Sequence, residues 1–186
     1  MIAEAMKAGR DGFVACIVLA RHVGLRIHEC LRIDTATARN ALKTGDLTIK
    51  GKNGLIRSVP INEPARIMLE KSLKFVSAGE KLFVPNDVQT HVVKAELQQF
   101  IREHRKLVQD GNSAKPLTFH GLRHTFAAEM FSNLIIEGKS EIEAKRQVSA
   151  LLGHRRAEVT NVYLASLRSE DNGGEVGENK AGEADV

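Results

Sequence analysis

The sequence predicts a mainly α-helical domain with one small antiparallel β-sheet, an α+β fold. Apolar residues recur at helical spacing over most of the 186 residues. The period changes to two over residues 47–51 and 56–61, and the Lys-Asn-Gly segment between them is typical of a β-hairpin. Apolar residues make up 42% of the chain and charged residues 27%, which fits one core under a charged surface.

The expected helices follow from apolar spacing and from residues that favour helix ends. Gly24 follows the first helix, and Ser140 with Glu143 has the spacing of a capping box. Residues 81–84 are expected to form a short strand or an extended segment, and only a short leader is expected before residue 11. The predicted helices cover residues 11–23, a segment from about 26, 35–42, 64–79, 88–111, 121–138, 140–153 and about 157–167.

The composition excludes several classes of protein. No segment reaches the run of about 18 apolar residues that a transmembrane helix needs, and the N-terminus lacks the pattern of a signal peptide. Cys16 and Cys30 both lie in apolar helical contexts and cannot form a disulfide framework. These features predict a cytoplasmic protein with no membrane partner.

The charge is divided unevenly along the chain. Residues 169–186 hold six acidic residues and one lysine, a net charge of −5, and are expected to be a disordered glycine-rich tail. Because the whole chain carries +4, residues 1–168 carry +9. This charge favours a polyanionic partner, although a merely basic, soluble surface is the alternative. Aromatic residues make up only 4% of the chain. A duplex held by its phosphates is therefore favoured over stacked single strands.

Residues suited to chemistry occur at four places far apart in the sequence. Taken singly, each group is typical of a salt bridge, a polar turn, a helix cap or a packed ring. Their types and order are more informative than any one of them. The four groups are Arg26 with Glu29, Lys52, His120 with Arg123, and His154 with Tyr163.

The order and spacing of these groups resemble the tyrosine recombinase (phage integrase) family. That family has the order Arg, Lys, His-x-x-Arg, His or Trp, and Tyr, and the resemblance extends from about residue 11 to residue 167. It implies a tyrosine recombinase catalytic-domain fold over residues 1–168 and a site-specific DNA recombinase or integrase. The segments that carry it are GLRIHECL (24–31), IKGKNGLIRSVPI (49–61), LTFHGLRHTFAAEM (117–130) and LLGHRRAEVTNVYL (151–164).

The resemblance implies a reaction that the residue types can support without a metal or a cofactor. Tyr163 would attack a DNA phosphate and form a 3′-phosphotyrosine with a free 5′-hydroxyl. Arg26 and Arg123 would offer planar forks to the nonbridging oxygens, and His154 would be a third donor. A hydroxyl from another strand would then reverse the step.

Three further residues have supporting roles in this scheme. His120 is the candidate base or proton carrier, and Lys52 is suited to protonating the leaving 5′-oxygen. Lys50 lies two positions away on the same strand face, but the count back from Val59-Pro60 favours Lys52. Glu29 matches the family's acidic position and could orient Arg26 or His120.

Two features depart from the family pattern. Arg123 and His154 are 31 positions apart, so the segment between them is longer than the expected helix–turn–helix. The extra residues are expected to lengthen a helix or loop, and they could move His154 slightly or serve a partner contact. Family members also have an N-terminal helical domain that closes around DNA, and none is recognised before residue 11, so a separate catalytic domain or a natural fragment is expected. The resemblance implies double-stranded DNA as partner and an assembly of four recombinases on paired sites.

Three alternatives remain open at this point. His120 and His124 have the spacing of two zinc ligands, but the intervening Gly-Leu-Arg lacks a metalloprotease glutamate and no third ligand is obvious. A type IB topoisomerase would use the same chemistry and rejoin the original strand. An inactive DNA-binding remnant of an integrase would bind duplexes without cutting them.

Overall fold

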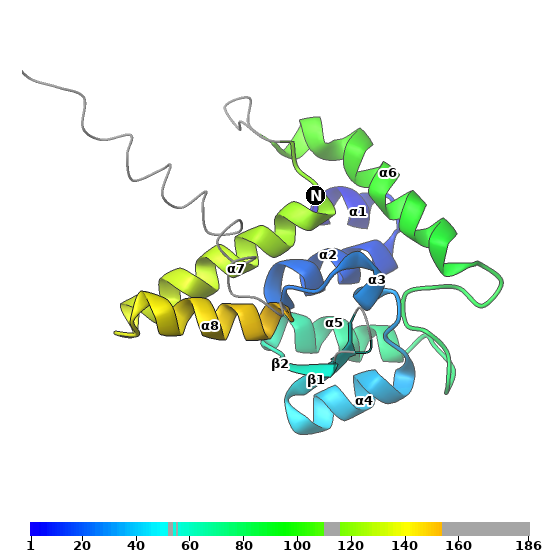
Figure 1. Ribbon diagram of the computed structural model, residues 1–186. Helices are drawn as coiled ribbons and strands as arrows, with labels where there is room; N and C mark the ends of the chain where they lie inside the picture. Colours follow the sequence, from blue (N-terminus) through cyan, green and yellow to red (C-terminus); the bar gives the residue numbers. More distant parts are fainter. Residues whose placement is uncertain (52–53, 55, 110–115, 154–186) are drawn as a thin grey trace, which may run out of the picture.

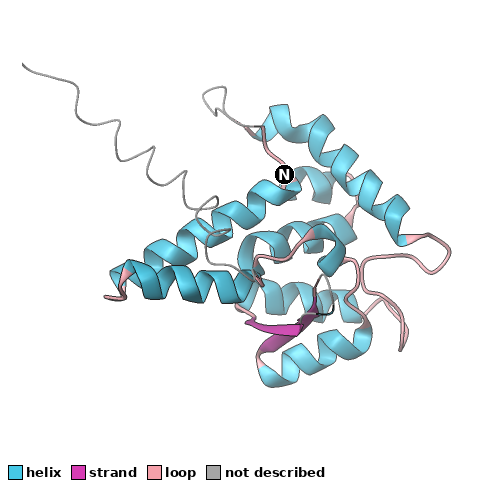
Figure 2. Cartoon of the chain, viewed as in Figure 1, coloured by secondary structure: helices cyan, strands magenta, loops and turns pink. Residues whose placement is uncertain are grey.

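The computed structural model describes residues 1–51, 54, 56–109 and 116–153. Most of these residues form helices, and a two-stranded antiparallel sheet lies at one side of them, which confirms the predicted fold class (Figures 1 and 2). Within the described residues, no helix is long and apolar enough to cross a membrane. The elements are α1 (Ile2–Lys7), α2 (Asp11–Val23), α3 (Ile27–Cys30), α4 (Thr35–Thr44), β1 (Asp46–Lys50), β2 (Ile56–Pro60), α5 (Glu63–Leu73), α6 (Thr90–Val108), α7 (Phe119–Ile136) and α8 (Glu141–Leu152).

Helix α2 lies at the centre of the core. Almost every residue from Phe13 to Val23 is buried, because α1, α3, α5 and α7 all contact this helix. A helix that is apolar on nearly all sides is stable only when it is surrounded in this way. Helix α2 ends at Gly24, whose φ of +69° is the left-handed conformation that glycine adopts without strain. The chain turns there and enters α3, so α2 fixes where Arg26 begins that helix.

The sheet contributes one unusual buried residue. Strands β1 and β2 pair with Leu47 opposite Val59 and Ile49 opposite Arg57. Both strands alternate exposed and buried residues, and Arg57 lies on the buried face of β2 beside these apolar residues. Because α8 contacts β2, this arginine is close to the end of α8 as well.

Helices α7 and α8 run side by side and project from the rest of the domain (Figure 1). Their apolar faces form a second, smaller core. The predicted capping box at the start of α8 is confirmed, because Ser140 and Glu143 hydrogen-bond to each other's main chain. Helix α7 begins at Phe119, two residues earlier than predicted, because the Thr118 side chain caps it by accepting the Gly121 N–H.

Four local predictions differ from the structure. Residues 2–7 form a helix where only a leader was expected, because Ala5 is completely buried. Helix α5 ends at Leu73 rather than near Gly79, because Phe75 is 87% exposed and adds no buried contact that would stabilise a further helical turn. Residues 81–84 contribute only one isolated bridge, between Lys81 and Asp34. Helix α6 is shorter at both ends than residues 88–111. The predicted helix near 157–167 lies outside the described residues.

The turn at Gly24 predicts a stability difference between two glycine substitutions. A Cβ added at Gly24 would lie 2.7 Å from Cε1 of Phe126 on α7, whereas Gly45 has a similar φ of +83° and no atom within 4 Å. We expect Gly24→Ala to lower the free energy of unfolding by about 3 kcal/mol, from backbone strain and overpacking together. Gly45→Ala should lower it by about 1 kcal/mol. Urea unfolding measures both, and equal losses would contradict the close α2–α7 contact.

Candidate active site

Glu29 occupies the centre of a buried polar cluster. The residue is 2% exposed, and its position in the first turn of α3 lets its carboxylate turn back to the start of that helix. The backbone N–H of Arg26 donates to Oε2 at 2.8 Å, and Nη1 of Arg26 donates to Oε1 at 3.0 Å. The predicted pairing of Glu29 with Arg26 is therefore present in the structure.

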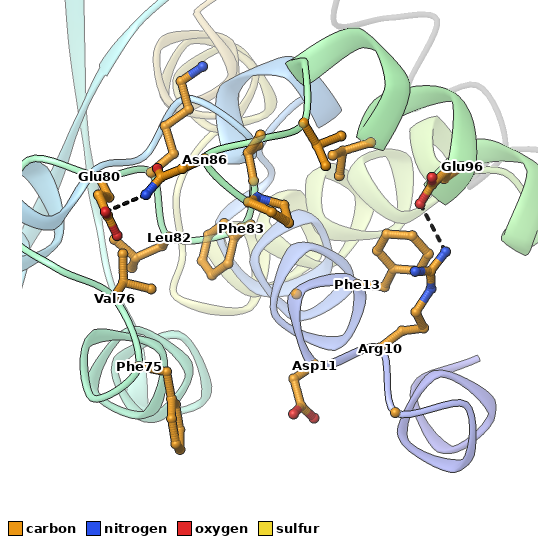
Figure 3. Close-up of a pocket in the computed structure, with 17 residues that line it drawn as sticks. Arg10, Asp11, Phe13, Phe75, Val76, Glu80, Leu82, Phe83, Asn86 and Glu96 are labelled. Carbon is orange, nitrogen blue, oxygen red and sulfur yellow. Dashed lines mark hydrogen bonds and ion pairs between the residues drawn. The ribbon is translucent and has the colours of Figure 1, made fainter.

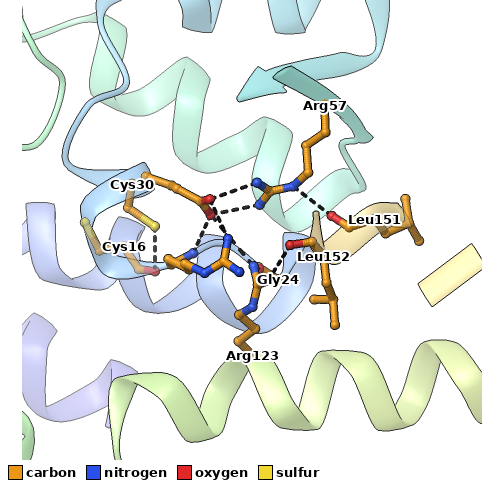
Figure 4. Close-up of polar contacts among 9 residues, drawn as sticks. Cys16, Gly24, Cys30, Arg57, Arg123, Leu151 and Leu152 are labelled. Atoms are coloured by element: carbon orange, nitrogen blue, oxygen red, sulfur yellow. Dashed lines mark hydrogen bonds and ion pairs between the residues drawn. The ribbon is translucent and has the colours of Figure 1, made fainter. Parts of the chain in front are cut away.

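Arg57 binds the same carboxylate from β2. Its Nη1 donates to Oε1 of Glu29 and its Nη2 to Oε2, both at 2.8 Å, which is the two-pronged geometry that guanidinium groups form with carboxylates. Its Nε donates to the carbonyl oxygen of Leu151 at 2.9 Å (Figure 4). One side chain thus links β2, α3 and the last turn of α8.

Arg123 approaches the cluster from α7. Its side chain is completely buried, and Nη1 lies 3.8 Å from Oε2 of Glu29. Nη1 also donates to the carbonyl oxygen of Gly24, and Nη2 donates to that of Leu152 (Figure 4). Arg123 therefore joins the end of α2 to the end of α8. The sequence predicts Arg123 as a site residue, but not that it is buried and engaged with the main chain.

Among the described residues, the three guanidinium groups of the cluster outnumber its one ionised carboxylate, so the cluster has a net positive charge. Burial raises the pKa of Glu29, but the hydrogen bonds and charge of Arg57, with contributions from Arg26 and Arg123, outweigh burial and lower this pKa to about 2. Three guanidinium groups then face one carboxylate. Arg26 is the member that reaches solvent, with 27% of its side chain exposed, so this arginine presents the excess charge to a ligand.

Beside Arg26 lies a small cavity of about 250 Å³. Basic side chains from three helices line it: Arg26 and His28 from the start of α3, Lys94 from α6, and His120 from α7. Among the described residues that line it, none is acidic. Such a cavity can hold an anionic group of the size of a phosphate.

His120 stands at the edge of this cavity with a lowered pKa. Partial burial of the ring and the nearby charges of Arg123 and Arg26 disfavour the imidazolium form. The ring packs edge-on against His124, with 4.8 Å between the ring centres. A neutral imidazole can accept a proton, so the structure is consistent with the predicted role as a base.

The structure brings four of the predicted residues to one place: Arg26, Glu29, His120 and Arg123. Lys52, His154 and Tyr163 lie outside the described residues. The described chain nevertheless reaches Gly153, whose added Cβ would lie 2.9 Å from Cδ of Arg57. The described part of the chain therefore ends beside the cluster, one position before His154.

Arg57 is the site residue that the sequence reasoning missed. Alternation along Ile56–Pro60 places Arg57 on the same face as Val59, so an arginine stands where the pattern requires an apolar residue. A charged side chain on the buried face of a strand indicates a buried partner. That signal was available in the sequence, but the partner's identity was not.

Two other features lie near or beyond this cluster. Within the described residues, no group of three or more His, Cys, Asp or Glu side chains could hold a metal ion, so the His120–His124 pair has no further metal ligand there.

A larger cavity of about 520 Å³ lies elsewhere, where the start of α2 faces the segment before α6 (Figure 3). An ion pair between Arg10 and Glu96 spans part of its lining at 2.9 Å. None of the predicted site residues that the structure describes lines this cavity.

The buried carboxylate predicts a specific acid sensitivity. Since the folded pKa of Glu29 is about 2 against an ordinary value of 4.5, its stabilisation is complete above about pH 4.5 and is lost as the pH falls towards 2. The difference between the unfolded and folded pKa of Glu29 contributes about 3 kcal/mol to the free energy of unfolding. Glu29→Gln should destabilise the protein by about 3–5 kcal/mol at neutral pH, and this deficit should shrink towards pH 2. Urea unfolding of both proteins from pH 2 to 7 measures it; a deficit independent of pH would contradict the account.

Comparisons with known proteins agree with the predicted family. The sequence model of the phage integrase family matches residues 4–170. Tyrosine recombinase XerC of Erythrobacter litoralis (strain HTCC2594) is 27% identical over 150 residues, which cover 81% of this chain and 45% of that protein. XerD of Listeria monocytogenes (serotype 4b, strain F2365) is 29% identical over 156 residues, 80% of this chain and 48% of that protein. The chain spans about half the length of these curated relatives.

Solved structures show the same fold at lower identity. XerA recombinase superposes with a TM-score of 0.62 at 20% identity, covering 92% of this chain and 60% of that one. A λ integrase dimer bound to a COC′ core site gives a TM-score of 0.63 at 17% identity, covering 97% of this chain and 48% of that one. The motif order, the arginine cluster and these matches lead to one conclusion: the chain belongs to the phage integrase family of tyrosine recombinases.

Proposed function

We propose that this chain is the catalytic domain of a site-specific DNA recombinase, which breaks and rejoins duplex DNA through Tyr163. The observation that carries the proposal is the excess positive charge around ionised Glu29, presented by Arg26 beside the neutral imidazole of His120. A phosphodiester in the adjoining cavity would meet a guanidinium donor and a proton acceptor together.

In the proposed first step, the Tyr163 hydroxyl gives its proton to a base, for which His120 is the candidate. The phenolate oxygen then bonds to phosphorus, and the bond from phosphorus to the 5′-oxygen breaks. Lys52 supplies a proton to that oxygen, and His154 donates a hydrogen bond to the phosphate. A 5′-hydroxyl of another strand reverses these events, so the step requires no metal, cofactor or nucleotide.

Arg26 and Arg123 have different proposed roles at the phosphate. Arg26 is partly exposed and can donate to a nonbridging oxygen directly. Arg123 is buried and donates to two main-chain carbonyls, so a direct bond from Arg123 to phosphate requires one of these contacts to open. With both contacts in place, Arg123 supplies positive potential and joins the end of α2 to the end of α8.

Duplex DNA is the proposed partner, and the proposed working form is a homotetramer on paired sites. The +9 charge of residues 1–168 supports a phosphate-rich partner. Two structural relatives, λ integrase and the Tn1549 transposon integrase, were solved in complex with DNA. We place this activity in the cytoplasm, which is consistent with Cys16 and Cys30 both being free and buried.

A covalent protein–DNA adduct is the direct test of this function. Nicked duplexes of randomised sequence trap a cut strand, because the short fragment diffuses away and cannot rejoin. We expect the chain to form an adduct that survives denaturation, and Tyr163→Phe to form none while binding duplexes normally. Arg26→Ala should slow adduct formation about 10²–10³-fold, as the loss of one transition-state donor does.

The outcomes separate the candidate functions. An adduct that persists in Tyr163→Phe would contradict the assignment of the nucleophile. Duplex binding by the chain, with no adduct on any sequence in the pool, would favour the inactive remnant. With two intact duplexes in place of the nicked ones, rejoining of the original strands alone, with no exchange between duplexes, would favour a topoisomerase.

The cavity also predicts a nonspecific DNA contact. Lys94 is an exposed lysine that lines it next to Arg26, so we expect Lys94→Ala to weaken duplex binding up to about tenfold at moderate salt. The slope of log Kd against log salt should fall by about one, as for the loss of one phosphate contact. Lys71→Ala is the matched control, because Lys71 is exposed on α5 and lines neither cavity described above. Fluorescence anisotropy over a salt series measures both; equal effects would contradict the assignment.

A further inference from the structure

We propose that Arg57 is a positioning residue for this active site, which acts by fixing the Glu29 carboxylate and, through it, the guanidinium groups of Arg26 and Arg123. The inference deepens the proposed function and rests on it. Arg57 does not line the cavity beside Arg26, so its role is to hold other residues rather than to touch DNA.

The hydrogen bonds show how one side chain can set the geometry of the others. Arg57 binds both oxygens of Glu29 in parallel at 2.8 Å, which fixes the plane and the rotation of the carboxylate. The remaining acceptor positions then point in set directions. Arg26 uses Oε1 at 3.0 Å, and Nη1 of Arg123 lies 3.8 Å from Oε2. Without Arg57, the carboxylate could rotate towards either neighbour.

Charge balance alone does not account for Arg57. Glu29 already has two cationic neighbours, Arg26 and Arg123, so a third guanidinium adds positive charge for which the described ion pairs of the cluster supply no second carboxylate. Burying that charge also costs free energy, whereas an apolar side chain at this strand position would pack beside Ile49 and Val59. The directional contacts of Arg57 are what an apolar residue would lack.

The third contact of Arg57 extends this role to the end of α8. Its Nε donates to the Leu151 carbonyl, and its Cδ lies where a Cβ on Gly153 would meet it at 2.9 Å. Gly153 has a φ of +65°, so the absence of a side chain there suits both the turn and the arginine. A lysine could keep the charge, but its single ammonium cannot reproduce a planar fork with a separate Nε donor.

The test compares Arg57→Lys and Arg57→Ala with a matched control. Arg21→Ala removes an arginine that is about one-third exposed and forms a two-pronged ion pair with Glu129, a residue outside the cluster. The readout is the single-turnover rate of covalent adduct formation on saturating nicked duplex. We expect a fall of about 10–100-fold in both Arg57 variants, as for other residues that orient catalytic groups. The Kd for duplex DNA should be unchanged, and Arg21→Ala should match the parent.

Two further readouts separate positioning from loss of structure. Millimolar guanidinium should restore part of the rate to Arg57→Ala and none to Arg57→Lys, because only the smaller residue leaves room for the ion. Acid should slow the parent as His120 is protonated, and it should slow Arg57→Ala more steeply, because Glu29 is then protonated as well. Among the described residues, Glu29 of that variant keeps Arg26, Arg123 and the nearby His28 as basic neighbours, and its pKa rises. Rates that equal the control, or a rate loss with neither rescue nor a pH shift, would overturn the proposal.

A separate measurement keeps the inference testable if the parent forms no adduct. In that case the proposed function fails, and positioning is judged from the ¹⁵N-guanidinium NMR signals of Arg26 and Arg123. We expect these signals to shift and broaden in Arg57→Lys and to stay as in the parent in Arg21→Ala. Unchanged signals in folded Arg57→Lys, with folding checked by circular dichroism, would overturn the inference.

Discussion

The site depends on one ion cluster: an ionised carboxylate buried among three guanidinium groups. A buried carboxylate is stable only when it is paired and fully hydrogen-bonded, and Glu29 meets this requirement through Arg26 and Arg57, with Arg123 close by. Because those arginines come from α3, β2 and α7, the cluster forms only when these elements are in their final places. The cluster has a net positive charge, and Arg26 is the member whose guanidinium side chain is partly exposed to solvent.

The helices around the cluster explain why distant parts of the sequence meet there. Helix α2 is buried on nearly all sides and ends at Gly24, whose carbonyl oxygen accepts a hydrogen bond from Arg123 of α7. Helix α8 ends at the same point, with the Leu151 and Leu152 carbonyls bound by Arg57 and Arg123. The same hydrogen bonds thus hold these elements together and position the arginines of the candidate site. The effect of a single arginine substitution is therefore best judged from the reaction rate and the free energy of unfolding together.

Sequence reasoning succeeded where the signal is local. Helical spacing located most helices, and alternation located the hairpin. The resemblance to the family, rather than a local pattern, grouped Arg26, Glu29, His120 and Arg123, and the structure places these four side chains close together. Sequence reasoning failed where the outcome depends on what lies opposite: the end of α5 after Leu73, the helix over 2–7, and the buried role of Arg57. Alternation along β2 places Arg57 on the buried face, but no local pattern identifies its partner Glu29, which is 28 positions away in the sequence.

The central claim is that this arginine cluster holds a DNA phosphate for attack by Tyr163. An experimental structure of the chain with a trapped DNA adduct tests this claim most directly. The account predicts phosphorus bonded to the Tyr163 oxygen, a nonbridging oxygen within hydrogen-bonding distance of Arg26, and His120 beside the same group. A phosphate joined to another residue, or one bound away from Arg26 and the cavity it lines, would contradict the account.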